Sequence, residues 1–122
     1  MQYMLLIYSS EEAWASMTED ERNAVYGDYF TFTNAIRESG NFVDGAPLQP
    51  ISTATAVRVR DGEQLVTDGP FAETKEQLGG FYLVEAENVD EAIEIAARIP
   101  GARYGTIEVR PVLPMGAEAA SA

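Results

Sequence analysis

The sequence contains no cysteine and no histidine. Without cysteine it has no disulfide, no thiolate nucleophile and no cysteine-ligated metal site. Without histidine it lacks the side chain that most often transfers protons near neutral pH. Any acid–base step must therefore use Asp, Glu, Lys or Tyr, or a group on the ligand itself.

Basic residues are also scarce, because eight Lys and Arg stand against 20 Asp and Glu, for a formal net charge of −12. No five-residue window holds more than two basic residues. Binding to phosphate backbones or to anionic membrane surfaces requires clustered basic side chains. We therefore expect no direct nucleic-acid partner and no membrane association.

Long apolar runs are absent as well, since no segment approaches the ~18 apolar residues of a membrane span. The N-terminal residues 1–8 have no basic flank and no cleavage site, so they are not typical of a secretory signal. We expect a soluble, cytoplasmic protein. The acids show no D-x-D-x-D spacing, so neither a metal nor a cofactor is expected.

The composition that remains is that of one ordinary domain. Hydrophobic residues make up 46% of the 122 positions, which is enough for a core. We expect a single domain over residues 1–114. Residues 115–122 are small and featureless, which predicts a flexible C-terminal tail.

Several segments show the patterns of strands. Residues 3–8 and 81–84 are apolar on both alternating faces, so each needs cover on both sides of a sheet. Residues 42–43 are expected to form a short strand before an irregular segment, and residues 104–112 a last strand. Residues 9–16 are expected to form a polar connection.

Capping signals and apolar spacing predict two helices. Thr18 and Glu21 form a capping box, and Gly40 ends the first helix. The apolar face of that helix is predicted to be Val25, Tyr29, Phe32 and Ile36. Asn88 repeats the signal before a shorter helix, whose inner side is predicted to be Val89, Ala92, Ile93, Ala96 and Ile99.

A β-hairpin is predicted in the middle of the chain. Residues 53–60 alternate, Asp61-Gly62 is a strong two-residue turn signal, and residues 63–67 return as the partner strand. Arg58 and Arg60 form either a solvated strand face, which we favour, or an anion-binding pair.

The order strand–helix–strand, hairpin, strand–helix–strand predicts an α+β fold. We expect a ferredoxin-like antiparallel sheet with two helices on one face and an extra β-hairpin. Two helices cover only one side of a four-stranded sheet, and residues 3–8 and 81–84 leave apolar side chains on the other. A second copy is the commonest cover, so we expect a homodimer formed sheet to sheet.

The segment DGPFAETKEQLGGFY at 68–82 separates two apolar runs. Pro70 follows Gly69 in a turn, and Gly79-Gly80 is expected to lead into the next strand by a route closed to residues with a Cβ. The segment is either a structural connection or a loop that faces a ligand.

Charged and aromatic side chains gather in this segment. If it faces a ligand, Asp68 is the candidate base, provided that Phe71 and the sheet desolvate it, and Lys75 would hold an anionic group or stabilise an enolate. The candidate ligand-binding residues are Phe71, Glu76, Tyr82 and Arg58. In the structural alternative, Asp68 caps its own turn and Lys75 pairs with a neighbouring acid.

Nearly the whole chain resembles the YCII-related family, in its branch with the DGPF motif. The resemblance is carried by YMLLIY at 3–8, AVRVRDG at 56–62, VTDGPFAETKEQLGGFY at 66–82 and IEVRP at 107–111. It implies a dimeric α+β barrel. The His/Asp pair proposed as an enzyme site in YCII proteins cannot be carried over, because this chain has no histidine.

Two functions follow as expectations. The first is the binding of a small polar or aromatic ligand in a pocket near the DGPF loop, with acid–base chemistry. The second comes from the branch's association with extracytoplasmic-function sigma factors, and is a non-catalytic accessory or regulatory interaction protein. An enclosed pocket beneath residues 68–82 would favour the ligand, and a flat, exposed loop would favour the protein partner.

Overall fold

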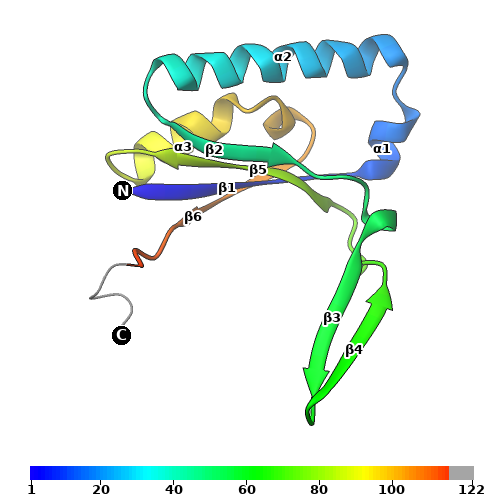
Figure 1. The fold of residues 1–122 in the computed structure, drawn as a ribbon. Coiled ribbons are helices and arrows are strands. Elements are labelled where there is room, and N and C mark those ends of the chain that lie inside the picture. The colour runs from blue at the N-terminus through cyan, green and yellow to red at the C-terminus, as the bar shows by residue number, and fades with distance from the viewer. Residues whose placement is uncertain (116–122) are drawn as a thin grey trace.

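Four antiparallel strands form the central sheet of the computed structural model, which describes residues 1–115 (Figure 1). The strands are β1 (Gln2–Ser9), β2 (Phe42–Pro47), β5 (Gln77–Glu85) and β6 (Thr106–Pro111). Their order is β2–β5–β1–β6, so β1 and β5 are central. Helices α2 (Glu19–Glu38) and α3 (Val89–Arg98) cover one face, which confirms the predicted ferredoxin-like arrangement.

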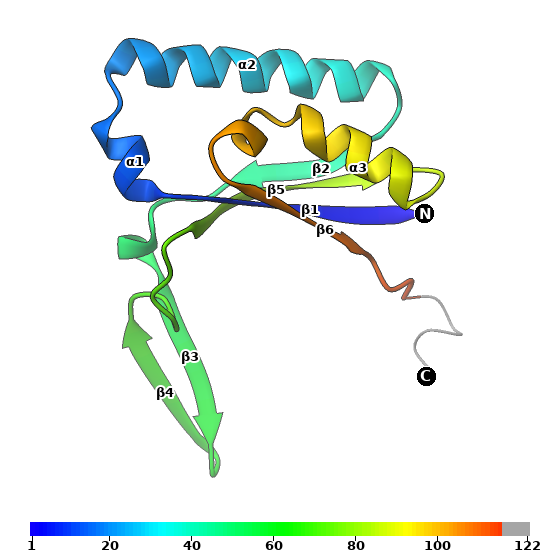
Figure 2. The same ribbon diagram turned by 180° about the vertical axis from the view of Figure 1, so that it is seen from behind.

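The predicted hairpin forms a sheet of its own from β3 (Thr55–Arg60) and β4 (Glu63–Asp68). Asp61 and Gly62 have φ of 52° and 78°, as a tight two-residue hairpin turn requires. The hairpin projects away from the sheet on the side opposite the two helices (Figures 1 and 2).

Helix α2 begins and packs as predicted. Thr18 is its N-cap, and both hydrogen bonds of the capping box with Glu21 are present. Val25, Phe32 and Ile36 are buried, and Phe32 and Ile36 belong to the core cluster formed with the sheet. Within residues 1–115, no helix combines the length and the apolar character needed to cross a bilayer.

The core lies between the sheet and the helices. Its largest fully buried side chains come from β1, β5, α2, α3 and the residue that follows α3, and they are Leu5, Val84, Ile36, Ile95 and Ile99. Alternate residues of β1 point into this core, since Tyr3, Leu5 and Ile7 are all buried.

The predicted inner side of α3 is partly wrong. Val89 and Ile93 are 46% and 52% exposed, whereas Ile95, which the prediction left out, is 2% exposed. The buried positions 92, 95, 96 and 99 keep the i, i+3, i+4, i+7 spacing of one helical face. Ile93 lies one position round the helix from Ala92 and therefore points away from the sheet.

Three predicted boundaries are also wrong. Residues 11–16 are not a loop but a short helix, α1 (Glu11–Ser16), whose N-cap Ser10 accepts a hydrogen bond from the Ala13 amide. Strand β2 extends to Pro47, because the register shifts at Val43 and lets residues 44–47 pair with β5. Strand β5 begins at Gln77 rather than at residue 81.

Gly79 and Gly80 therefore lie inside β5, and neither has a positive φ. The expected route closed to residues with a Cβ therefore does not come from an unusual backbone conformation at either glycine. Gly80 is constrained instead by close approach of β2, because a Cβ there would lie 3.0 Å from the carbonyl oxygen of Ala46.

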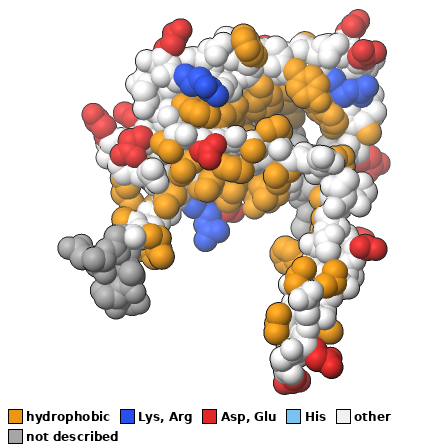
Figure 3. All heavy atoms as spheres, in the orientation of Figure 1, with side chains coloured by type: hydrophobic (Ala, Val, Ile, Leu, Met, Phe, Trp, Pro, Cys, Tyr) orange, Lys and Arg blue, Asp and Glu red, His pale blue; other side chains and the backbone are white. Residues whose placement is uncertain are grey.

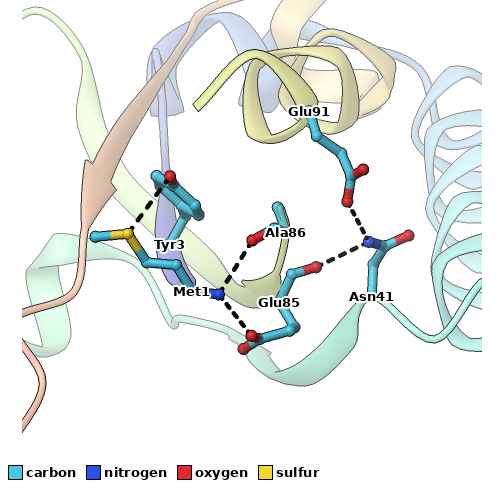
Figure 4. A network of polar contacts seen from close by, with 6 residues as sticks. All are labelled: Met1, Tyr3, Asn41, Glu85, Ala86 and Glu91. Carbon is cyan, nitrogen blue, oxygen red and sulfur yellow. Dashed lines mark hydrogen bonds and ion pairs between the residues drawn. The ribbon is translucent and has the colours of Figure 1, made fainter. Parts of the chain in front are cut away.

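A polar network fixes the end of the sheet at the start of β1 (Figure 4). The Met1 ammonium donates to the Glu85 carboxylate at 2.6 Å and to the Ala86 carbonyl at 3.1 Å. The Asn41 amide donates to the Glu85 carbonyl at 2.8 Å and to the Glu91 carboxylate at 3.1 Å. These bonds tie the ends of β1 and β5 to the chain that leaves α2.

The second face of the sheet is apolar and lies opposite the helices. Met4 pairs with Leu83, and Leu6 pairs with Phe81, so these four side chains share that face. All four are only partly buried. Of the tail predicted for residues 115–122, only Met115 is among the described residues.

Candidate functional site

An open groove of about 1010 Å³ lies where the end of β1 and the start of α1 meet the chain between β4 and β5. Its lining comes from three parts of the sequence: residues 10–12, Ile51 in the 3₁₀ turn η1 (Ile51–Thr53), and residues 73–77. The pairing of Ser9 with Gln77 in the sheet brings the first and last of these parts together.

Gln77 holds two walls of the groove in place. Its side-chain oxygen accepts a hydrogen bond from the Glu11 amide at 2.9 Å. Its side-chain amide donates to the Thr74 carbonyl at 2.5 Å. One side chain thus ties the start of α1 to the loop before β5.

Two of the groove's carboxylates also make fixed contacts. The Glu11 carboxylate accepts from the Ile51 amide at 3.0 Å, which fixes η1 against α1. The Glu76 carboxylate accepts from the Thr106 hydroxyl at 2.9 Å, which ties the loop to β6. The groove is therefore built on bonds between parts that are distant in sequence, so its shape does not depend on the loop alone.

The other three charged side chains of the groove are free. Within residues 1–115, the side chains of Glu12, Glu73 and Lys75 make no hydrogen bond and no ion pair, and all three residues are exposed. Four glutamates and one lysine line the groove, so its field is negative, with one positive point.

A smaller hollow of about 340 Å³ adjoins the groove. Ile51, Glu73 and Thr74 line both, and Ser52, Gly69 and Pro70 complete the smaller one. The φ of Gly69 is +99°, and its amide donates to the Ala54 carbonyl at 2.7 Å. Two residues of the DGPF turn, Gly69 and Pro70, therefore line this hollow.

The structure brings only two of the predicted site residues together. Lys75 and Glu76 both line the groove. Asp68 lies at the end of β4, is exposed, and lines neither hollow. Phe71 is 82% exposed, so it does not desolvate Asp68 within one chain.

Neither contact of the structural alternative is observed. Within the described residues 1–115, the Asp68 carboxylate caps no turn, and the Lys75 ammonium pairs with no acid. The roles proposed for Asp68 and Lys75 stay predictions.

Tyr82 lies in the core beneath α2. Its hydroxyl is 2.7 Å from that of Thr33, and its ring packs edge to face on Phe32 and Phe42. Burial raises the pKa of Tyr82 above its ordinary value, and the Thr33 hydrogen bond opposes this only in part. Its predicted role in ligand binding would need a ligand to reach the core.

Arg58 lies on β3, where both it and Arg60 are exposed. The structure thus places the pair on a solvated strand face of the projecting hairpin, away from the groove. Within residues 1–115 no cluster of three or more Asp and Glu is placed to hold a metal ion.

Sequence patterns alone did not single out Glu11, Glu12 and Glu73, which line the groove. Residues 11 and 12 fall in a segment predicted as a polar connection, and Glu73 is one acid in a polar loop. The signal that points to them is the adjacency of β1 and β5, since each strand ends or begins beside these acids.

Comparison with known proteins gives two kinds of match. The sequence pattern of the YCII-related domain matches residues 1–116. An uncharacterised protein of Rhizobium meliloti (strain 1021) is 38% identical to the chain over 114 residues, which cover 92% of each protein.

A solved structure shares the fold. It is the 5-chloro-2-hydroxyhydroquinone dehydrochlorinase of Burkholderia phenoliruptrix AC1100 in complex with 2,5-dihydroxybenzoquinone. The TM-score is 0.55 at 14% identity, over 92% of this chain and 93% of the other. The likeness therefore extends over the whole fold but not to individual side chains.

Proposed function

This chain belongs to the YCII-related family, and on that basis we propose that it binds a small polar ligand in the groove beside Lys75. The observation that carries the proposal is the set of free charges, Glu12, Glu73 and Lys75, on walls held together by Gln77 and Glu11. Free charged groups on a rigid frame can bind a ligand without first breaking contacts of their own.

The lining sets the chemistry of the ligand. Ionised carboxylates only accept hydrogen bonds, so Glu12 and Glu73 fit hydroxyl or amino groups. Lys75 only donates, so it fits one acidic oxygen of the same molecule. A small hydroxylated ring or a small polyol meets both conditions, whereas a multiply anionic molecule would be repelled by the four glutamates.

Two further features support a small ring as the ligand. The dehydrochlorinase with the same fold was solved in complex with a dihydroxylated quinone, which shows that the fold can hold a molecule of this kind. The Asp68-Gly69-Pro70-Phe71 turn, which we assign to the DGPF branch of the family, contributes Gly69 and Pro70 to the smaller hollow beside the groove.

An acid–base step is the finer part of the proposal. With no histidine in the chain, a proton would move to Asp68 or to a groove glutamate. Asp68 is exposed in one chain, so the apolar surroundings that it needs as a base would have to come from a second copy or from the ligand.

A second copy also fits the open face of the sheet. Met4, Leu6, Phe81 and Leu83 lie side by side on a face that no helix within residues 1–115 covers. Sheets with such a face are stable in water when another layer packs on it. We infer a homodimer in which the two open faces meet.

Ligand-observed NMR against a set of small phenols, polyols and amines tests the binding. Compounds that bind the wild type should lose about tenfold or more in affinity with Glu73→Gln or Lys75→Met, because each removes one charge-assisted contact. Glu63→Gln is the matched control, since it removes the same charge from the far end of the hairpin. Compounds that bind all three variants as tightly as the wild type would contradict the proposed site.

A further inference from the structure

The hairpin Thr55–Asp68, here named the arm, makes few contacts with the rest of residues 1–115. Of its strand residues, all but the half-buried Ala56 are exposed. Strands β3 and β4 contact each other extensively. Within residues 1–115, neither strand contacts another strand or helix to a comparable degree. Figure 3 shows the arm standing clear of the body, with hydrophobic side chains along its length.

The two faces of the arm differ in chemistry. Val57 is paired with Val66, and Val59 with Gln64, so the three valines share one face. Arg58, Arg60, Leu65 and Glu63 lie on the other face. Val57, Val59 and Val66 are 60%, 60% and 55% exposed, so the apolar face is open to water.

An exposed ribbon of this kind is not stable by itself. A two-stranded hairpin in water is marginal at best, and it becomes stable when a hydrophobic face packs on another element. The arm nevertheless has six consecutive paired positions and a well-formed turn. We therefore expect the apolar face of the arm to pack against another surface. No element within residues 1–115 of the same chain covers this face.

Interface area argues for a second copy as the cover. Four strands ~4.8 Å apart and ~20 Å long present a sheet face of about 400 Å², which is half of the ~800 Å² that each partner buries in a standard interface. The arm is ~20 Å long and ~10 Å wide, so its apolar face adds about 200 Å². The open sheet face and the arm lie on the same side of the molecule (Figures 1 and 2).

The length of the arm fixes how it meets that copy. Packed sheets lie ~10 Å apart, so an arm ~20 Å long cannot stay within the gap. It must pass the edge of the partner's sheet and lie along its flank, and by symmetry the partner's arm does the same. Arg58 and Arg60 are two of only eight basic residues, and they place positive charge near a partner of net charge −12.

We propose that the arm of each copy clasps a second copy through Val57, Val59 and Val66. The proposal rests on the homodimer inferred above and adds the element that stabilises it. It also explains why the hairpin has an apolar face that no element within residues 1–115 of its own chain covers. Ligand binding in the groove does not depend on it.

Sedimentation velocity over a concentration series tests the arm. Val57→Ser with Val66→Ser should raise the dimer dissociation constant by about tenfold or more, because two apolar side chains lose their cover. Leu65→Ser is the matched control, since it removes an apolar side chain from the opposite face of the same hairpin, and it should change the constant by less than about threefold.

Each result has a definite meaning. A dimer that is unchanged by the double variant overturns the clasp and leaves the sheet-to-sheet dimer standing. A wild-type protein that is monomeric at every concentration overturns both the clasp and the sheet-to-sheet dimer. Ligand binding in the groove is then tested separately, by the NMR experiment above. If circular dichroism shows that the double variant is unfolded, Val59→Thr replaces it, because Thr keeps the β-branched shape. An unchanged dissociation constant for Val59→Thr overturns the clasp equally.

Discussion

Gly105→Ala should disrupt the frame that carries the groove. Gly105 follows the 3₁₀ turn η2 (Pro100–Arg103) and leads into β6, where the chain begins to pair with the end of β1. A Cβ on this residue would lie 2.1 Å from the carbonyl oxygen of Tyr8 and 3.0 Å from the Cα of Ser9. Both contacts are with backbone, so no side-chain rotation relieves them.

The cost follows from how the clash is relieved. Forcing extra volume into a packed site costs ~1–3 kcal/mol, and losing the neighbouring backbone hydrogen bond between β1 and β6 adds about 1 kcal/mol. We expect the free energy of unfolding to fall by about 3 kcal/mol. Because Ser10 follows Ser9 directly and caps α1, the variant should also weaken ligand binding in molecules that still fold.

Urea unfolding measures this, with two other glycines as controls. Gly27 lies in α2 with nothing near its Cβ position, so Gly27→Ala should raise stability by about 1 kcal/mol. Gly69 also has free space, but its φ is +99°, so Gly69→Ala should cost about 1–2 kcal/mol. If Gly105→Ala unfolds at the same urea concentration as the wild type, the close approach of Gly105 to the end of β1 is not as described.

Two further predictions concern single side chains. Burial raises the pKa of Tyr82 in the folded protein above the unfolded value of about 10. The neutral form of Tyr82 therefore contributes its full stability below pH ~10, and this contribution is lost as the pH rises through the folded pKa. Tyr82→Phe should therefore flatten the fall of unfolding free energy above pH ~10, and an equal slope in both proteins would contradict this. Lys75→Met should leave the melting temperature unchanged or slightly higher, because the ammonium makes no ion pair within residues 1–115. A loss of about 2 kcal/mol would instead make Lys75 part of the structural frame.

Local patterns in the sequence predicted most of the fold. The capping box at Thr18 and the spacing of Val25, Phe32 and Ile36 were sufficient for α2, and Asp61-Gly62 was sufficient for the hairpin. These signals act over a few residues, so a single chain displays them. Helix α1 was missed because its six residues include none that is buried, and so it has no apolar stripe.

The candidate site could be predicted only in part. Lys75 and Glu76 lie in a recognisable segment. Their neighbour in the groove, Glu11, is 66 residues away from Gln77, although the Glu11 amide donates a hydrogen bond to the Gln77 side chain. That contact depends on the register of β1 against β5, including a shift between Ile7 and Tyr8. Register over such a distance is set by tertiary packing, which no local pattern reports.

Amide chemical-shift mapping shows directly whether the groove binds a small polar ligand. A compound that binds the wild-type protein is titrated into the isotope-labelled chain. We expect the largest shifts in residues 10–12, at Ile51 and in residues 73–77, with little change at Glu63 on the hairpin. Shifts confined to the open sheet face or to the arm, with the groove amides unmoved, would contradict the proposed function.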